Sequence, residues 1–169
     1  MKPGILTGLI WLFLGVSSPA LADGLVFDPS ATSACLAAQE TEDAALLCAG
    51  RAAEACIIAT PGGYSTVAMA GCLDRELTWW DAALNAAYAD ALRAAKEADA
   101  SGAYGPRGRP EAERSLREMQ RAWIPFRDAR CIFEEAKWGG GTGGGPAFIG
   151  CLMQETARQT LILRRGMGL

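Results

Sequence analysis

The sequence predicts an all-α fold, a small helical bundle stapled by disulfide bonds. Apolar residues recur every three or four residues over long stretches, which is the period of one helix face. No alternating run of β-branched residues, typical of a strand, is present. The six cysteines in this chain of 169 residues can form up to three disulfide bonds. We therefore expect one domain, with two long antiparallel helices and a shorter helix on each side.

Residues 1–22 have the features of a secretory signal peptide. Lys2 provides a basic start, residues 5–16 are mostly apolar, and Ala20-Leu21-Ala22 is a small-residue cleavage site. The apolar run is shorter than the roughly 20 residues that a membrane span requires. We expect cleavage after Ala22, export to the periplasm or the medium, and a single mature domain over residues 23–169.

Glycine and proline residues that interrupt helices divide the mature chain into helical segments. Residues 33–58 have a helix-compatible composition that is interrupted at Gly50. The run Thr60-Pro61-Gly62-Gly63 then breaks the chain. The clearest helix follows over about 66–99, and its charged residues, Glu76 among them, are expected mostly off its apolar stripe. That stripe consists of Leu73, Leu77, Trp80, Leu84, Tyr88 and Leu92.

A second long helix is expected over about 109–137, with Pro110 in its first turn. Pro125 lies in the interior of this helix and predicts a kink there. The glycine-rich run over 139–145 then opposes regular structure, and a last helix is expected over about 147–164. The stripe of the second long helix consists of Leu116, Met119, Trp123, Phe126, Arg130 and Phe133, with Trp123 in the core.

All six cysteines lie in the part of the chain expected to be exported, where an oxidising compartment favours disulfides. No closely spaced pair suggests a thiolate metal site, and many pairings of six cysteines are open. Antiparallel packing of the two long helices brings Cys72, Cys131 and Cys151 to one pole of the bundle. The pair preferred on this ground is Cys131–Cys151, which closes the glycine-rich loop. The pairs Cys35–Cys48 and Cys56–Cys72 then follow.

The sequence lacks the residues of the common catalytic sites. Histidine is absent, which excludes His-dependent triads and His-ligated metal sites. No nucleophile motif, catalytic carboxylate pair or metal-ligand cluster is evident, so we expect no enzymatic activity and no cofactor or metal. The glycine-rich run lacks the Gly-Lys-Ser/Thr ending of a phosphate-binding loop. A formal charge of −3 argues against a general nucleic-acid binder.

Polar residues on the long helices are candidates for a hydrogen-bond network that fixes the helix register. Asn85 is expected at or near the buried face. Asn85 and Arg127, together with Thr156 or Arg158, are expected to make hydrogen bonds between helices. Arg127 and Asp128 are adjacent and point about 100° apart, so we expect no pair between them. A ligand or partner site is the alternative use of these residues. The candidate network is Asn85, Tyr88, Arg127 and Asp128.

Three groups of residues together carry a family resemblance. They are Cys72 with Asp81-x-x-Leu84-Asn85-x-x-Tyr88, then Gln120-Arg121-x-Trp123-x-x-x-Arg127-Asp128-x-x-Cys131, then the glycine-rich run with Cys151, Thr156 and Arg158. Over about 56–164 the chain resembles the LprI-like family of small exported bacterial helical proteins, which includes lysozyme inhibitors. It departs from the family in the closer spacing of Thr156 and Arg158, and in lacking the lipid-accepting cysteine of the named member.

The resemblance implies a non-enzymatic exported protein that binds another macromolecule, in particular a lysozyme whose substrate cleft it occludes. An acidic protein is steered toward a basic lysozyme. The candidate partner-binding residues are Trp138 and Thr142 at the glycine-rich loop, and Trp79, which otherwise packs under the N-terminal helical segment. The alternative is an envelope structural or accessory protein, or a small-ligand binder, without lysozyme contact.

Overall fold

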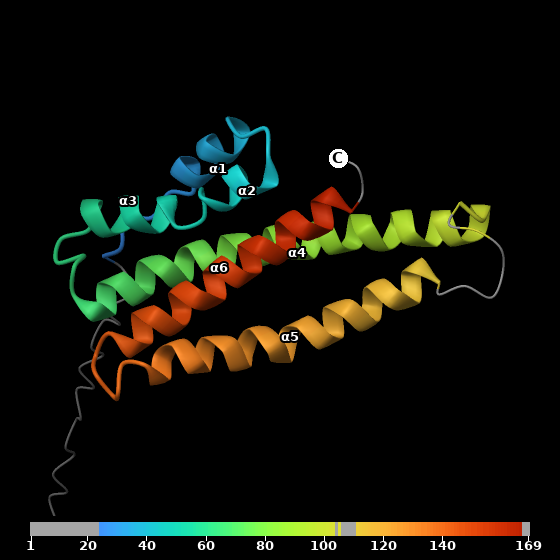
Figure 1. Ribbon diagram of the computed structural model, residues 1–169. Coiled ribbons are helices and arrows are strands. Elements are labelled where there is room, and N and C mark those ends of the chain that lie inside the picture. Colours follow the sequence, from blue (N-terminus) through green and yellow to red (C-terminus); the bar gives the residue numbers. More distant parts are fainter. Residues whose placement is uncertain (1–23, 104, 106–110, 167–169) are drawn as a thin grey trace, which may run out of the picture.

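The structure, a computed structural model, describes residues 24–103, 105 and 111–166 (Figure 1). All regular structure in these residues is helical, which confirms the predicted fold class. The predicted signal peptide over 1–22 and Pro110 lie outside the described residues. The helices are α1 (Ser30–Ala37), α2 (Glu42–Leu46), α3 (Arg51–Ala59), α4 (Thr66–Ser101), α5 (Ala112–Ala136) and α6 (Gly144–Arg165).

The helices α4, α5 and α6 form an elongated bundle in which α6 packs against both of the others, beginning between them and crossing α4 toward its C-terminal end (Figure 1). The helices α4 and α6 run in the same direction, and α5 runs antiparallel to both. Because α6 packs against α4, α5 and α2, it is buried on most sides from Met153 to Leu163. The last helix, expected as a flanking element, is therefore the central helix of the bundle.

The three short helices form a small N-terminal layer against α4 and α6. The segment over 33–58 divides into these helices at two places. The Thr41 hydroxyl accepts a hydrogen bond from the Ala44 N–H at 3.3 Å and so begins α2. Gly50 has a φ of 102°, a left-handed conformation that favours glycine, and it begins α3.

The carboxylate of Glu76 on α4 joins the N-terminal layer to the bundle and is fully buried. Its oxygens accept hydrogen bonds from the N–H groups of Gly50 at 2.8 Å and Ala53 at 2.6 Å, which caps the N-terminus of α3. The Thr32 hydroxyl at 2.8 Å and the Trp80 indole N–H at 3.2 Å also donate to it. The expectation that Glu76 lies off the buried stripe is wrong, because these donors replace water around the carboxylate.

Three disulfides connect neighbouring elements, and they are the same pairs that the sequence analysis preferred. Cys35–Cys48 closes the segment that holds α1 and α2, Cys56–Cys72 links α3 to α4, and Cys131–Cys151 links α5 to α6. Each restricts the unfolded chain and contributes about 2–4 kcal/mol in typical proteins.

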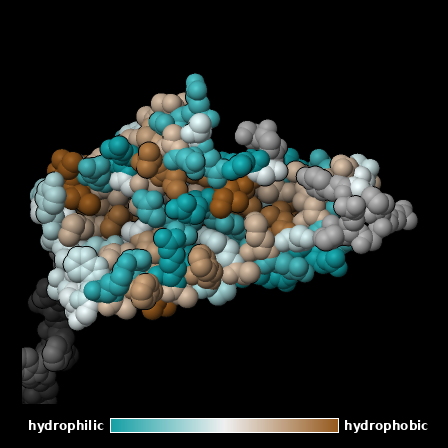
Figure 2. Space-filling model, viewed as in Figure 1, coloured by the Kyte–Doolittle hydropathy of each residue, from teal (hydrophilic) through white to brown (hydrophobic). Residues whose placement is uncertain are grey.

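The helix α5 differs most from the expected packing. Its fully buried residue is Cys131, and Leu116 and Trp123 pack partly buried against the core. Phe126 and Phe133, however, are 59% and 64% exposed. The expectation of one core-facing stripe is wrong for these residues because α5 lies at the edge of the bundle and uses only a narrow face. Figure 2 shows hydrophobic residues reaching the surface along the lower edge of the molecule, over α5.

Pro125 lies in the interior of α5, which continues unbroken through it. Proline removes one backbone donor and crowds the preceding turn of a helix. Figure 1 shows α5 changing direction near its middle, as expected for a proline-associated bend.

Candidate binding surface at the disulfide pole

One end of the bundle, which we call the disulfide pole, carries two loops. Residues 60–65 connect α3 to α4, and residues 137–143 connect α5 to α6 (Figure 1). A disulfide closes each loop near its base, Cys56–Cys72 for the first and Cys131–Cys151 for the second. The helices that flank each loop are therefore held together by a covalent bond.

The two loops lie at about the same level along the bundle. A Cβ built on Gly150 of α6 would lie 3.7 Å from a methyl group of Leu73 on α4, so the two helices touch at this point. Thr66, the first residue of α4, and Gly144, the first of α6, precede that contact by similar numbers of residues. Since the helices run in the same direction and have the same rise per residue, their N-terminal loops end side by side.

The glycine-rich loop is a compact series of turns. The Gly141 N–H donates to the Trp138 carbonyl at 2.9 Å, and the Gly144 N–H donates to the Gly141 carbonyl at 3.0 Å. Gly139 and Gly140 have φ values of 57° and 82°, in the left-handed region that favours glycine. The glycines therefore allow tight reversals, and α6 begins at Gly144, three residues earlier than expected.

The indole ring of Trp138 packs onto its own loop. A Cβ on Gly143 would lie 2.1 Å from an atom of that ring, so a larger residue would displace the ring. Trp138 nevertheless remains 54% exposed, and Thr142 beside it is exposed. The loop thus presents a large, exposed aromatic ring that packs against Gly143 of the same loop.

The first loop presents another aromatic side chain, Tyr64, which the sequence analysis did not select. Tyr64 is 75% exposed, and Ile58 and Val67 near it are also exposed. A Cβ on Gly63 would lie 2.0 Å from the carbonyl oxygen of Ile57, so the loop turns very tightly. Figure 2 shows hydrophobic residues at the surface where α3 meets α4. An aromatic residue directly after Pro-Gly-Gly, between two paired cysteines, is the sequence signal that identifies it.

Trp79 and Trp80 have different surroundings although they are adjacent. Trp80 is fully buried, as expected. Trp79 is partly buried against the core beneath the N-terminal layer, and its ring meets that of Trp80 edge-on with centroids 4.9 Å apart. Its packing role leaves less of its surface for a partner than Trp138 offers.

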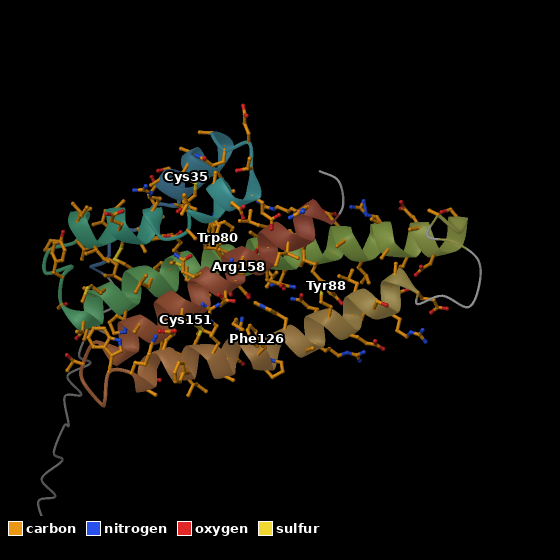
Figure 3. All side chains as sticks on the ribbon, viewed as in Figure 1. Cys35, Trp80, Tyr88, Phe126, Cys151 and Arg158 are labelled. Atoms are coloured by element: carbon orange, nitrogen blue, oxygen red, sulfur yellow. A yellow bond between two sulfur atoms is a disulfide. The ribbon has the colours of Figure 1, made fainter. Side chains whose placement is uncertain are left out.

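The proposed polar network does not form between helices. Asn85 is exposed, and its amide donates to Asp81 of the same helix at 3.3 Å. The expectation of a buried position is wrong because Asn85 follows Leu84 on the side of α4 turned away from α6. Tyr88 is partly buried and packs in the smaller core cluster with Leu84 and Trp123, and Figure 3 shows it on the part of α4 that faces α5.

Arg127 and Asp128 form an ion pair, contrary to expectation. The Arg127 Nε and a terminal guanidinium nitrogen lie 2.9 and 2.8 Å from Asp128 Oδ1. The long arginine side chain bridges the angle that separates adjacent positions on a helix. The Arg127 guanidinium also lies over the Trp123 ring, 4.9 Å from its centroid, which is cation–π geometry.

Other residues make the polar contacts between α5 and α6. Arg130 is paired with Glu155, whose side chain is 4% exposed, and the Gln159 amide donates to Gln120 at 2.9 Å. Arg158 lies 3.6 Å from the same Glu155 carboxylate. The Thr156 hydroxyl oxygen is buried and has no hydrogen-bond partner among the described residues. These contacts fix the register of α5 against α6.

The described residues contain no cluster of three or more potential metal-ligating side chains. The side-chain and backbone hydrogen bonds of Ser30 lower the pKa of Asp28, an exposed group beside the start of α1.

An open groove of about 580 Å³ lies between the α1–α2 connection and the end of α6, bordered by the Arg165–Glu42 ion pair. No helix among the described residues has the length and apolarity needed to cross a membrane.

Comparison with known proteins identifies relatives of the chain. The family model described as lysozyme inhibitor LprI matches residues 56–163. The chain is also 28% identical over 153 residues to an uncharacterized 17.7 kDa protein in the puhA 5' region of Rhodobacter capsulatus, and the match covers 89% of each chain. No solved structure matches the chain significantly. The family match includes both loops of the disulfide pole.

Proposed function

Because the chain belongs to the LprI family of lysozyme inhibitors, we propose that it is an exported, non-enzymatic protein that binds a lysozyme through the disulfide pole. The observation that carries the assignment to this surface is the exposed Trp138 on a short loop closed by Cys131–Cys151. Tryptophan is among the residues that contribute most to protein interfaces.

The proposed mechanism is occlusion of the substrate cleft. A protruding loop with an aromatic side chain fits a concave, sugar-binding cleft better than the side of a helical bundle does. The disulfide and the contact between Trp138 and Gly143 restrain the loop before binding, which reduces the entropy lost in the complex. Tyr64 on the neighbouring loop extends the same surface.

The test is a lysozyme assay on bacterial cell walls, with the oxidised protein titrated in at low and moderate salt. We expect near-stoichiometric inhibition that persists at moderate salt. Trp138→Ala should weaken inhibition at least about 30-fold, the loss typical of an interface hot spot. Leu47→Ala is a matched control, since Leu47 is 76% exposed in the N-terminal layer, away from the pole.

Three outcomes would contradict the proposal in different ways. No inhibition of several lysozyme types would remove the function and favour an envelope accessory role. Inhibition restricted to low salt would indicate nonspecific charge attraction. Equal inhibition by Trp138→Ala and the unchanged protein, with the same helical circular dichroism, would remove the surface assignment. Lysis by the protein alone would contradict the non-enzymatic role.

A further inference from the structure

An exposed stripe of α5 repeats with the spacing of a coiled-coil seam. The residues follow one another at alternating intervals of four and three, the heptad pattern of positions that meet a partner helix. All of them are exposed in the structure. We call this set the outer stripe, and it consists of Ser115, Met119, Ala122, Phe126, Ala129, Phe133 and Ala136.

The packing of the bundle makes little use of the outer stripe, although Met119 also lines a pocket with Leu116 of α5 and Leu163 of α6. The core-facing side of α5 is marked by the buried Cys131 and the partly buried Leu116 and Trp123. The outer stripe is centred about 180° from Cys131 around the helix axis, on the opposite side of α5. Figure 3 shows Phe126 on α5, away from the α4–α6 interface. A continuous exposed apolar seam on a helix of 25 residues is typical of an interaction surface.

Large and small side chains alternate along the outer stripe. Met119, Phe126 and Phe133 occupy one heptad position, and a serine and three alanines occupy the other. In a parallel helix pair, each position meets its own equivalent, so phenylalanine would oppose phenylalanine and alanine would oppose alanine. In an antiparallel pair, the two positions meet each other, so every large side chain faces a small one. The alternation therefore matches an antiparallel copy of the same helix.

We propose that two copies of this protein associate through their α5 helices, antiparallel and two-fold symmetric, along the outer stripe. With Phe126 level with Ala129 of the second copy, Met119 is level with Ala136 of that copy and Phe133 with Ala122 of that copy. A symmetric interface of this kind is closed and limits assembly to the dimer. The two disulfide poles then lie at opposite ends of the dimer.

The exposed apolar side chains supply part of the area that such a dimer requires. Burial of one phenylalanine removes roughly 150–250 Å² from water, so the exposed parts of Phe126 and Phe133, 59% and 64% of each, together supply about 180–310 Å². Met119, the small residues and the neighbouring Ile132, which is 58% exposed, add to this area. A standard interface buries roughly 800 Å² per partner, so the polar flanks of the outer stripe would supply the rest.

The first test is the molar mass of the oxidised full mature protein in solution, measured by sedimentation across a concentration range. We expect a dimer for the unchanged protein, and Phe126→Glu should raise the dissociation constant at least about 100-fold. Leu47→Glu is the matched control, since Leu47 is 76% exposed and lies off α5 and away from the disulfide pole. Circular dichroism and thermal unfolding verify that each variant is folded.

The orientation is tested with a nitroxide spin label at Arg114→Cys. Antiparallel pairing in this register separates the two labels by about 40 Å along the helix axes, whereas parallel pairing puts them side by side. A monomer at all concentrations, a dimer that persists in Phe126→Glu, or adjacent labels would each overturn the proposal. The proposal would also be overturned if the protein is a monomer and Phe126→Glu abolishes lysozyme inhibition. The outer stripe would then contact the lysozyme and not a second copy.

Discussion

Glu76 and Asp99, near opposite ends of α4, cap other helices in very different surroundings. Glu76 is fully buried and accepts four hydrogen bonds, two of them from the first turn of α3. Asp99 is partly exposed and accepts two, from the N–H groups of Ala112 at 2.8 Å and Glu113 at 2.9 Å, which cap α5. The two ends therefore share a capping mechanism but differ in access to water.

The two halves of α4 also differ in their disulfide bonds and in the side chains that pack around them. The first half of α4 lies beside Cys56–Cys72 and packs around Trp80. The second half has no disulfide among the described residues and packs through small side chains such as Ala91 and Ala95. The comparison indicates that stability is concentrated toward the disulfide pole. At the other end, water can replace a lost contact.

The largest effect is expected for Glu76→Ala. It leaves two backbone N–H groups and the Trp80 indole N–H without a partner inside the protein, so we expect a loss of about 3 kcal/mol in unfolding free energy. Urea unfolding of the oxidised protein measures it. Glu76→Gln, which retains one carbonyl acceptor, should lose less. A loss below that of Asp99→Ala would contradict the comparison.

For Asp99→Ala we expect a smaller loss of unfolding free energy, about 1 kcal/mol, because water can hydrate the freed N–H groups of α5. Hydrogen exchange should accelerate in the first turn of α5 and remain unchanged in α3. The control is Asp90→Ala, since Asp90 is exposed and pairs only with Arg93 on its own helix among the described contacts. Faster exchange in α3 would show that the two ends are not independent.

The smallest effect is expected for Asn85→Ala, in the middle of α4. Asn85 is exposed and has one weak contact with Asp81 on its own helix, so the stability should change by less than about 0.5 kcal/mol. Thermal unfolding under two-state conditions measures it. A loss comparable with that of Glu76→Ala would restore the interhelical role that the structure assigns to other residues.

Periodicity and breakers were sufficient to predict the long helices. The expected helix over about 66–99 is observed as α4 over Thr66–Ser101, because Ser65 caps its start and Gly102 ends it in a left-handed conformation. The expected helix directions also bring Cys131 and Cys151 to one pole, and the structure joins these two cysteines. These features depend on local sequence, which a single chain records directly.

The surroundings of individual side chains were less predictable. An apolar stripe on α5 could be read from the sequence, but its exposure depends on where α6 packs. Glu76 has the same spacing as Cys72 and Trp80 on α4, yet a carboxylate is expected in water until its donors from α3 are known. At the disulfide pole, Trp138 was selected and Tyr64 was missed, because the proximity of their loops is a tertiary property.

The three disulfides also set how the chain can oxidise as it enters an oxidising compartment. Each joins cysteines that are consecutive along the chain, first to second, third to fourth and fifth to sixth. A chain that emerges with its N-terminus first therefore presents the two halves of each bond before the next cysteine arrives. Pairing in order of arrival gives the observed bonds, so we expect oxidative folding to need an oxidase but no disulfide isomerase.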